Sequence, residues 1–141
     1  MQNGITPGIA NGITEVLTGR RVEAVSGGGR LDLRLEGPVT VRVAHEFRFA
    51  APSFDAPAEV EHFFPALTIR PTAPLLALVG RTVDTARITL AGGLELGFAE
   101  GGALSVPPHA LLAPWSVETA EGAVCAGLPG GEVGWTVPGG A

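Results

Sequence analysis

The sequence contains no lysine and no tyrosine, and charged residues of either sign make up only 16% of it. An ordinary soluble domain has about 25%. All nine basic residues are arginines, and 14 acidic residues outnumber them, so the formal net charge is −5. Nucleic-acid binding and adhesion to anionic membranes both require a clustered basic surface, which this charge balance disfavours.

Cysteine is nearly absent as well, because Cys125 is the only one. A single cysteine excludes an intrachain disulfide and a cysteine-based metal site, and between apolar neighbours it is most often a small buried hydrophobe. No serine lies in the Gly-x-Ser-x-Gly elbow of a nucleophile, and residues 27–29 lack the helix and the Lys-Ser/Thr pair that follow a phosphate-binding glycine loop. We therefore expect neither an enzyme nor a cofactor.

Long apolar runs are missing too, since none approaches the roughly 18 residues that a membrane-spanning helix needs. The amino terminus lacks the basic region and the continuous apolar stretch of a signal peptide, so the expected location is the cytoplasm. Residues 1–10 are interrupted by glycine and proline and are expected to form a loose arm. Residues 11–141 have the length of a single domain.

Short alternating segments, separated by the abundant glycine (21) and proline (12), are what the sequence does contain. Leu31, Leu33 and Leu35 alternate with polar residues, which is the pattern of a strand with one buried and one wet face. Comparable segments are expected to be strands: residues 22–26, 31–36, 39–43, 67–69, 83–90, 94–99, 103–106, 115–119, 123–128 and 132–137. The alternation of residues 39–43 continues through residue 49, so this strand is expected to be long or bent.

About nine or ten short strands with frequent turns predict an all-β fold, mainly antiparallel, arranged as a sandwich or a closed roll. One or two short helices are expected beside the sheets. The first would follow Asn11 and stop at Gly19, and the second would be capped by Thr72 and stop at Gly80.

Two stretches, residues 17–41 and 78–106, resemble each other. The matching positions at an offset of 61 residues are Leu17, Gly19, Arg20 and Val22 against Leu78, Gly80, Arg81 and Val83. The offset grows by two residues at each glycine-rich turn, where insertions cost least. This pattern predicts an internal two-fold repeat with units at about residues 11–71 and 72–137. Leu33 and Leu96 should then occupy matching buried positions, with Arg34 and Gly97 on the opposite side of the strands.

The second half also resembles a small, uncharacterised actinobacterial family of all-β domains. The resemblance rests on LxLxFxxGxxLxVPP at residues 94–108, on Trp115 with Val117, and on Pro-Gly-Gly-Glu at residues 129–132 followed by Trp135. It is strongest over residues 78–137. The resemblance implies an all-β fold, and it implies no activity or catalytic residue.

Histidines are the weak candidates for a metal site: His45, His62 and His109. Their spacings match no known ligand pattern, so scattered surface histidines are the favoured interpretation. The large aromatic side chains are the candidates for binding, because tryptophan and phenylalanine are common in cores and at interfaces alike. They are Trp115, Trp135, Phe47, Phe49, Phe63 and Phe64.

Two hypotheses about function remain open. The first is a non-enzymatic β-rich module, immunity-like or accessory, that acts through a protein partner; it rests on an acidic β-scaffold without a catalytic set of residues. The alternative is a carrier whose barrel mouth, lined by the phenylalanines and Trp115, holds a small apolar ligand. The identity of a partner or ligand and the oligomeric state are left open by the sequence.

Overall fold

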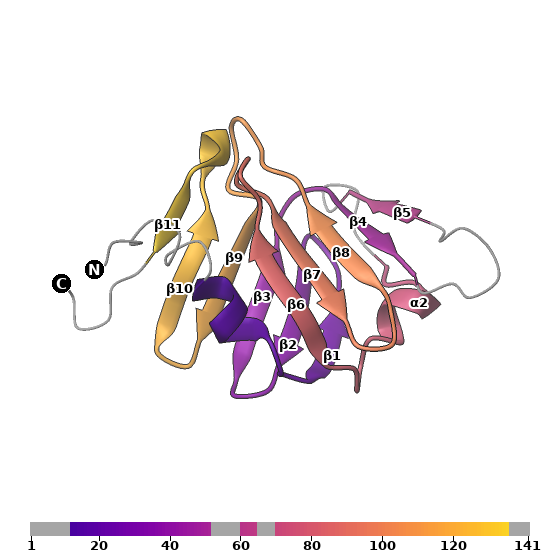
Figure 1. Cartoon of the computed structure of the whole chain (residues 1–141). Coiled ribbons are helices and arrows are strands. Elements are labelled where there is room, and N and C mark those ends of the chain that lie inside the picture. The colour runs from indigo at the N-terminus through magenta and orange to yellow at the C-terminus, as the bar shows by residue number, and fades with distance from the viewer. Residues whose placement is uncertain (1–11, 52–59, 65–69, 136–141) are drawn as a thin grey trace.

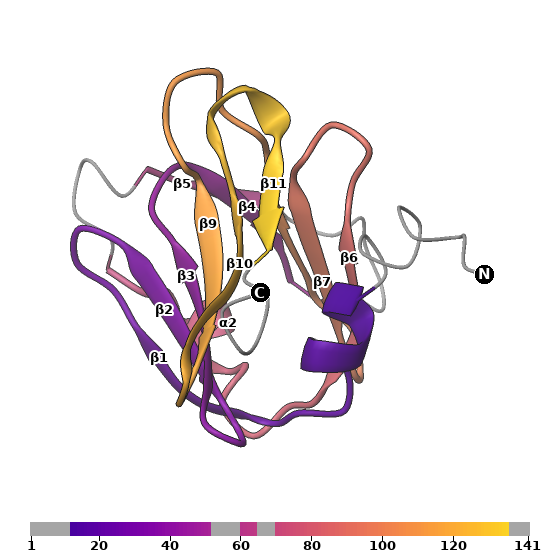
Figure 2. The same cartoon turned by 90° about the vertical axis from the view of Figure 1, so that its left-hand side faces the viewer.

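The fold is a β-sandwich, seen in a computed structural model that describes residues 12–51, 60–64 and 70–135. Figures 1 and 2 show two sheets packed face to face. One cluster of buried apolar side chains fills the space between the sheets. The predicted arm at residues 1–10 and the predicted strand at residues 67–69 lie outside the described residues.

The larger sheet has six strands, in the spatial order β1 (Val22–Ser26), β2 (Leu31–Leu35), β3 (Val39–Val43), β9 (Trp115–Thr119), β10 (Gly122–Gly127) and β11 (Val133–Trp135). All of its pairings are antiparallel. The alternating leucines of β2 and valines of β3 face each other in register, as in the pair Leu33 and Val41. These side chains are buried, while Asp32 and Arg34 point to the outer face, as the alternation predicts.

The smaller sheet has five strands, in the order β5 (Val60–Phe63), β4 (Phe47–Ala50), β8 (Ala103–Val106), β7 (Leu94–Phe98) and β6 (Val83–Ile88). Its pairings are antiparallel too. The all-β, mainly antiparallel prediction is therefore confirmed. The closed roll is wrong, because the described residues form two separate sheets, and the one isolated bridge near their edges, Arg21 with Thr82, lies just before β1 and β6 and does not extend into a ladder that closes a barrel.

The expected single long strand after residue 39 is two strands in different sheets. β3 ends at Val43, residues 44–46 cross from one sheet to the other, and β4 begins at Phe47. The alternation persists across this crossover because both strands direct their odd-numbered side chains into the same core. Periodicity alone therefore could not reveal the break.

Two short helices and one 3-10 turn complete the described residues: a helix at residues 12–17, α2 (Ala73–Leu76) and η2 (Pro129–Gly131). Gly19 lies just after the first helix with a positive φ angle of 88°, as expected of a helix stop. The predicted stop of the second helix at Gly80 is wrong, because α2 ends at Leu76, and Gly80, with a φ of 92°, lies in the turn beyond it. Thr72 precedes α2 but its side chain makes no capping bond; its hydroxyl donates to Glu61 of β5. None of the helices has the length and apolar character that a membrane crossing requires.

The two predicted core leucines are buried: Leu33 is 0% exposed and Leu96 is 1% exposed. Arg34 is exposed and Gly97 is half-buried on the outer faces. Four main-chain hydrogen bonds also join the two stretches, and they form two reciprocal pairs between positions that match at the offset of 61 residues. In the first pair, Gly19 N–H donates to Val83 O and Gly80 N–H donates to Val22 O. In the second pair, Val22 N–H donates to Arg81 O and Val83 N–H donates to Arg20 O. Equivalence of the two stretches over their full length remains a prediction, which these reciprocal bonds support.

Candidate functional site

Three loops gather at one end of the sandwich, which we call the loop end. They are residues 89–93 between β6 and β7, residues 107–114 between β8 and β9, and residues 128–132 between β10 and β11, where η2 lies. All three stand at the top of the molecule in Figures 1 and 2. The crossover at residues 44–46 joins them, because Ala44 N–H donates to Pro114 O at 2.9 Å.

The loops are bound to one another by main-chain contacts. Gly130 N–H donates to His109 O at 2.8 Å, which ties the third loop to the second. The indole Nε1–H of Trp115 donates to Gly92 O at 3.1 Å and so holds the first loop to β9. Gly92 lies so close to Gly131 that a Cβ atom at residue 92 would overlap the carbonyl oxygen of residue 131. The loop end is therefore a packed surface with a defined shape.

Leucine side chains project from all three of these loops. Leu90 is 109% exposed, Leu111 is 79% exposed, and Leu112 and Leu128 are 50% and 38% exposed. They make up four of the eight large apolar side chains that the described residues expose. Single exposed leucines are ordinary on a soluble protein, whereas a group on adjoining loops is typical of an interaction surface.

The charges on the three loops and the crossover are few and acidic, and Arg30, in the β1–β2 turn at the same end, pairs with Asp32. The three loops and the crossover contain Glu46 and Glu132 but no arginine. The opposite end of the sandwich, at the bottom of Figure 1, has a charged character: its hairpin turns carry Glu36, Glu100 and Glu121. The two ends thus differ in chemistry, and the apolar one is the candidate binding surface.

Two of the three candidate histidines meet at the loop end. The rings of His45 and His109 lie edge to face, with their centroids 4.1 Å apart. The Nδ1 atom of His109 accepts hydrogen bonds from the main-chain N–H groups of Leu111 and Leu112, each at 3.0 Å. His62 lies apart from them on β5, where it pairs across the strands with Arg48.

This geometry does not suit a metal ion at His109. Its Nδ1 lone pair is occupied by two N–H donors, so the remaining proton of the neutral ring sits on Nε2, and neither nitrogen offers a free lone pair. A metal-binding histidine has the reverse arrangement, in which the ring N–H donates to an acceptor. Among the residues that the structure describes, no group of three or more His, Cys, Asp or Glu side chains is placed to hold a metal.

The phenylalanines proposed as binding residues do not form a common surface. Phe47 and Phe49 are 1% and 0% exposed, and Phe63 stacks on Phe47 with ring centroids 4.7 Å apart. Phe64 is 49% exposed at the end of β5. Strand alternation buries the first three in the core, so Phe64 alone of these four is available to a partner.

The two tryptophans have different surroundings. Trp115 is 1% exposed, and its contact with Gly92 makes it the inner support of the loop end. Trp135 is half-buried at the edge of the larger sheet and packs on Gly12, where a Cβ would lie 3.2 Å from the ring. Trp115, a candidate binding residue from the sequence, therefore lies in the core beneath the loop end. It supports that surface without being exposed on it.

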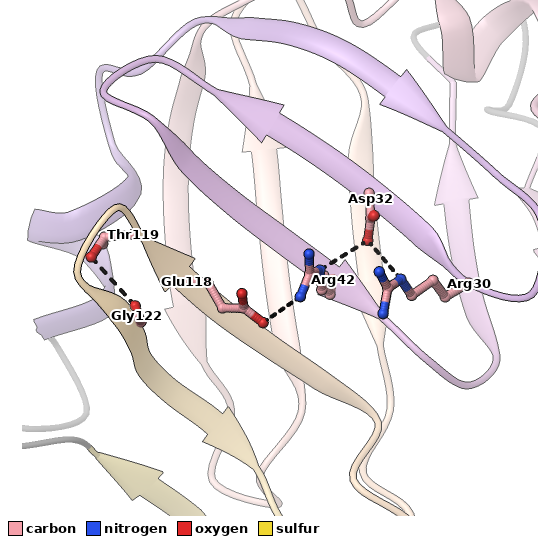
Figure 3. Close-up of polar contacts among 6 residues, drawn as sticks. All are labelled: Arg30, Asp32, Arg42, Glu118, Thr119 and Gly122. Atoms are coloured by element: carbon pink, nitrogen blue, oxygen red, sulfur yellow. Dashed lines mark hydrogen bonds and ion pairs between the residues drawn. The ribbon is translucent and has the colours of Figure 1, made fainter.

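The outer face of the larger sheet carries a ladder of ion pairs, shown in Figure 3. Asp32 lies between Arg30 and Arg42 at 3.4 and 3.5 Å, and Arg42 donates to Glu118 at 2.6 Å. Asp32 of β2 and Arg42 of β3 are register partners, whereas Glu118 of β9 lies diagonally from Arg42, opposite Thr40, and Arg30 immediately precedes β2. Because these charged side chains pair with one another, no ligand is needed to account for the polar outer face of the larger sheet.

The outer face of the smaller sheet has a shallow hollow of about 260 Å³. Its floor is Gly97 and Ala103, its hydroxyl groups come from Thr85 and Ser105, and Glu95 closes one side in an ion pair with Arg87 at 2.6 Å. A ligand site usually combines an apolar cavity with a few convergent polar groups. In this hollow the charged groups pair with each other, so the hollow is a weaker candidate for a binding site than the loop end.

Cys125 is 2% exposed in the core, and burial raises the pKa of its thiol to about 12. We expect no reaction of the native thiol with a thiol reagent at pH 8 and full reaction after unfolding, since the thiolate is the nucleophile. The folded state holds this proton more tightly than the unfolded chain. The resulting stabilisation is present below pH 9 and is lost as the pH rises toward 12.

The chain offers an unusually clean measurement of this effect. It contains no lysine and no tyrosine, so few other side chains titrate in the same window. The free energy of unfolding, measured by urea at several pH values, should fall between pH 9 and 12 in the natural chain and stay flat in Cys125→Ala. An equal fall in both proteins would show that Cys125 does not cause it.

Comparison with known proteins identifies the family of this chain but gives it no function. A family model described as "Family of unknown function (DUF6188)" matches residues 13–136, which covers both halves of the sandwich and not only the second. No curated protein and no solved structure matches the chain. The actinobacterial origin that the resemblance implies stays a prediction. The chain belongs to DUF6188, a family of unknown function.

Proposed function

We propose that this chain is a non-enzymatic module that binds a partner protein in the cytoplasm through its loop end. The observation that carries the proposal is the group of four exposed leucines on three adjoining loops, led by Leu90 and Leu111. The loops are fixed by main-chain hydrogen bonds and by the Gly92–Gly131 contact. A preorganised surface binds with less loss of conformational entropy than a flexible one.

The exposed leucines of this surface can supply part of the binding energy of a complex. Transfer of one leucine side chain from water into a partner contributes about 1.5–3 kcal/mol. Three or four such anchors exceed the lower estimates of the cost of association, about 4 kcal/mol. Leu90 and Leu111, the most exposed, have the most apolar area to bury and should be the main anchors.

The charges at the loop end indicate the chemistry of the partner. Glu46 and Glu132 are acidic, and no arginine lies in these loops, so the matching surface is apolar with basic residues at its rim. The same charges disfavour an anionic membrane, which attracts basic residues at the point of contact. A protein partner therefore fits this surface better than a lipid surface.

The apolar-ligand carrier has less support. It required an aromatic mouth, but Phe47, Phe49 and Trp115 are core residues, each at most 1% exposed. The sandwich is also not a closed barrel. A side chain packed in the core cannot line an open binding site.

Serine substitutions at Leu90 and Leu111 test the proposal. A partner is captured from cell extract with the natural chain, identified, purified and returned to a two-component binding measurement. We expect the double variant Leu90→Ser/Leu111→Ser to bind it at least tenfold more weakly, because two apolar anchors are lost. Both side chains are exposed, so the midpoint of urea unfolding should stay unchanged.

Leu76→Ser is the matched control. Leu76 is 47% exposed on α2, away from the loop end, and its substitution should leave the affinity unchanged. Equal affinities of the natural chain and the double variant would contradict the proposal. So would binding of the chain to vesicles, or a self-association that the leucine substitutions abolish, since either outcome assigns the surface to another occupant.

A further inference from the structure

We propose that His109 is a positioning residue that holds Leu111 and Leu112 in place for binding only while its Nδ1 is unprotonated, so that acid weakens the complex. The inference rests on the proposed function for its effect on binding. Its structural part concerns the second loop of the loop end, residues 107–114. That part can be tested on the chain alone.

The second loop is fastened at both ends by main-chain hydrogen bonds to other elements. His109 O accepts from Gly130 N–H at 2.8 Å, and Pro114 O accepts from Ala44 N–H at 2.9 Å. Between these two points, no main-chain hydrogen bond to another main-chain group is formed within the described part of the chain. The middle of the loop is held instead by the imidazole of His109.

The imidazole holds the loop as an acceptor. Nδ1 accepts from Leu111 N–H and Leu112 N–H, both at 3.0 Å. An acceptor nitrogen must keep its lone pair, so the bonds require the neutral ring with its proton on Nε2. The two leucines presented by this arrangement are 79% and 50% exposed, and both belong to the proposed binding surface.

Protonation of the ring removes this support. An imidazolium has two N–H donors and no acceptor, so both bonds to the leucine amides are lost together. The charged and titratable groups on the elements packed against this loop are His45 and Glu46 on the crossover and Glu132 beside η2; residues 89–93 contribute none. His45 lies 4.1 Å from His109, and two charged rings at this distance repel each other.

Amide hydrogen exchange by NMR tests the structural part on the full chain. The exchange rates of Leu111 and Leu112 are compared with those of an unstructured chain at the same pH, between pH 5 and 8, where imidazoles titrate. We expect protection of both amides to fall about tenfold on acidification, as the loss of ordinary hydrogen bonds implies. Val117, in the middle of β9, serves as the reference for global stability and should not change.

Two substitutions separate positioning from simple packing. In His109→Asn, the side-chain oxygen can replace Nδ1 as the acceptor in an Asx-type turn and does not titrate, so protection should persist at pH 5. In His109→Ala, protection should be low at every pH. A natural chain whose two amides are equally protected at pH 5 and pH 8, or an Asn variant that behaves like the Ala variant, would overturn the proposal.

Binding to the purified partner tests the functional part. The natural chain should bind about tenfold more weakly at pH 5 than at pH 8, and His109→Asn should bind equally at both. Equal pH dependence in the two proteins would overturn control by His109, while the leucine substitutions would still report on the binding surface. If the leucine substitutions do not weaken binding, but the protection of the Leu111 and Leu112 amides depends on His109, then the proposed function is wrong and the structural part of the inference is supported.

Discussion

Truncation of either Leu33 or Leu96 to alanine is expected to destabilise the protein by about 2–5 kcal/mol, because the loss of transfer free energy and the remaining cavity add. Each leucine is at most 1% exposed in the middle of its strand. Leu33 faces Val41 across β2 and β3, and Leu96 faces Leu104 across β7 and β8. Both losses fall in the same core cluster, and urea unfolding measures them directly.

Arg34→Ala is the matched control for Leu33→Ala. Arg34 is the next residue on β2, it is exposed, and its loss should cost under about 0.5 kcal/mol. A Leu33→Ala chain as stable as Arg34→Ala would mean that the inner face of β2 is not in the core. The register between β2 and β3 would then be wrong.

Gly92→Ala is expected to have the second large effect, through the loop end. Gly92 has a φ of 98°, and a Cβ atom there would overlap the main-chain carbonyl of Gly131. The backbone conformation costs about 1–3 kcal/mol for a residue with a side chain. The overlap adds to this, because the first and third loops must separate. We therefore expect both lower stability and loss of partner binding.

Gly80→Ala separates the two causes. Gly80 has a similar φ of 92°, but no atom lies within 4 Å of the position of its Cβ. This variant should show the conformational cost alone and keep its affinity for the partner. Equal loss of stability in the two variants would show that the first and third loops are not packed against each other at Gly92.

Much of the fold was predictable because one face of each strand is buried. The alternation in β2, β3 and β7 predicted both the strands and their inner faces, and Gly19 predicted where the first helix stops. The crossover at residues 44–46 was not predictable from periodicity, because Val43 and Phe47 point into the same core from opposite sheets. Alternation reports which face is buried and not which sheet a strand joins.

The binding surface was missed because exposure at the loop end depends on which loops meet. Leu90, Leu111 and Leu128 are far apart in the sequence, and their loops are brought together by contacts such as that between Gly92 and Gly131. The size of the aromatic side chains favoured Phe47, Phe49 and Phe63 as binding residues instead, but strand alternation directs these three side chains into the core. One signal was present: two leucines, residues 111 and 112, lie between prolines 108 and 114 in a segment without alternation.

Hydrogen–deuterium exchange of the full chain, free and bound to its purified partner, tests the proposed binding surface most directly. Slower exchange on binding should be confined to residues 89–93, 107–114 and 128–132 and to the crossover at residues 44–46. Strands β2, β3 and β9, whose outer face carries the ion-pair ladder with Asp32 and Arg42, should be unchanged. Slower exchange on these three strands, with none at the three loops, would contradict the assignment of the loop end as the binding surface.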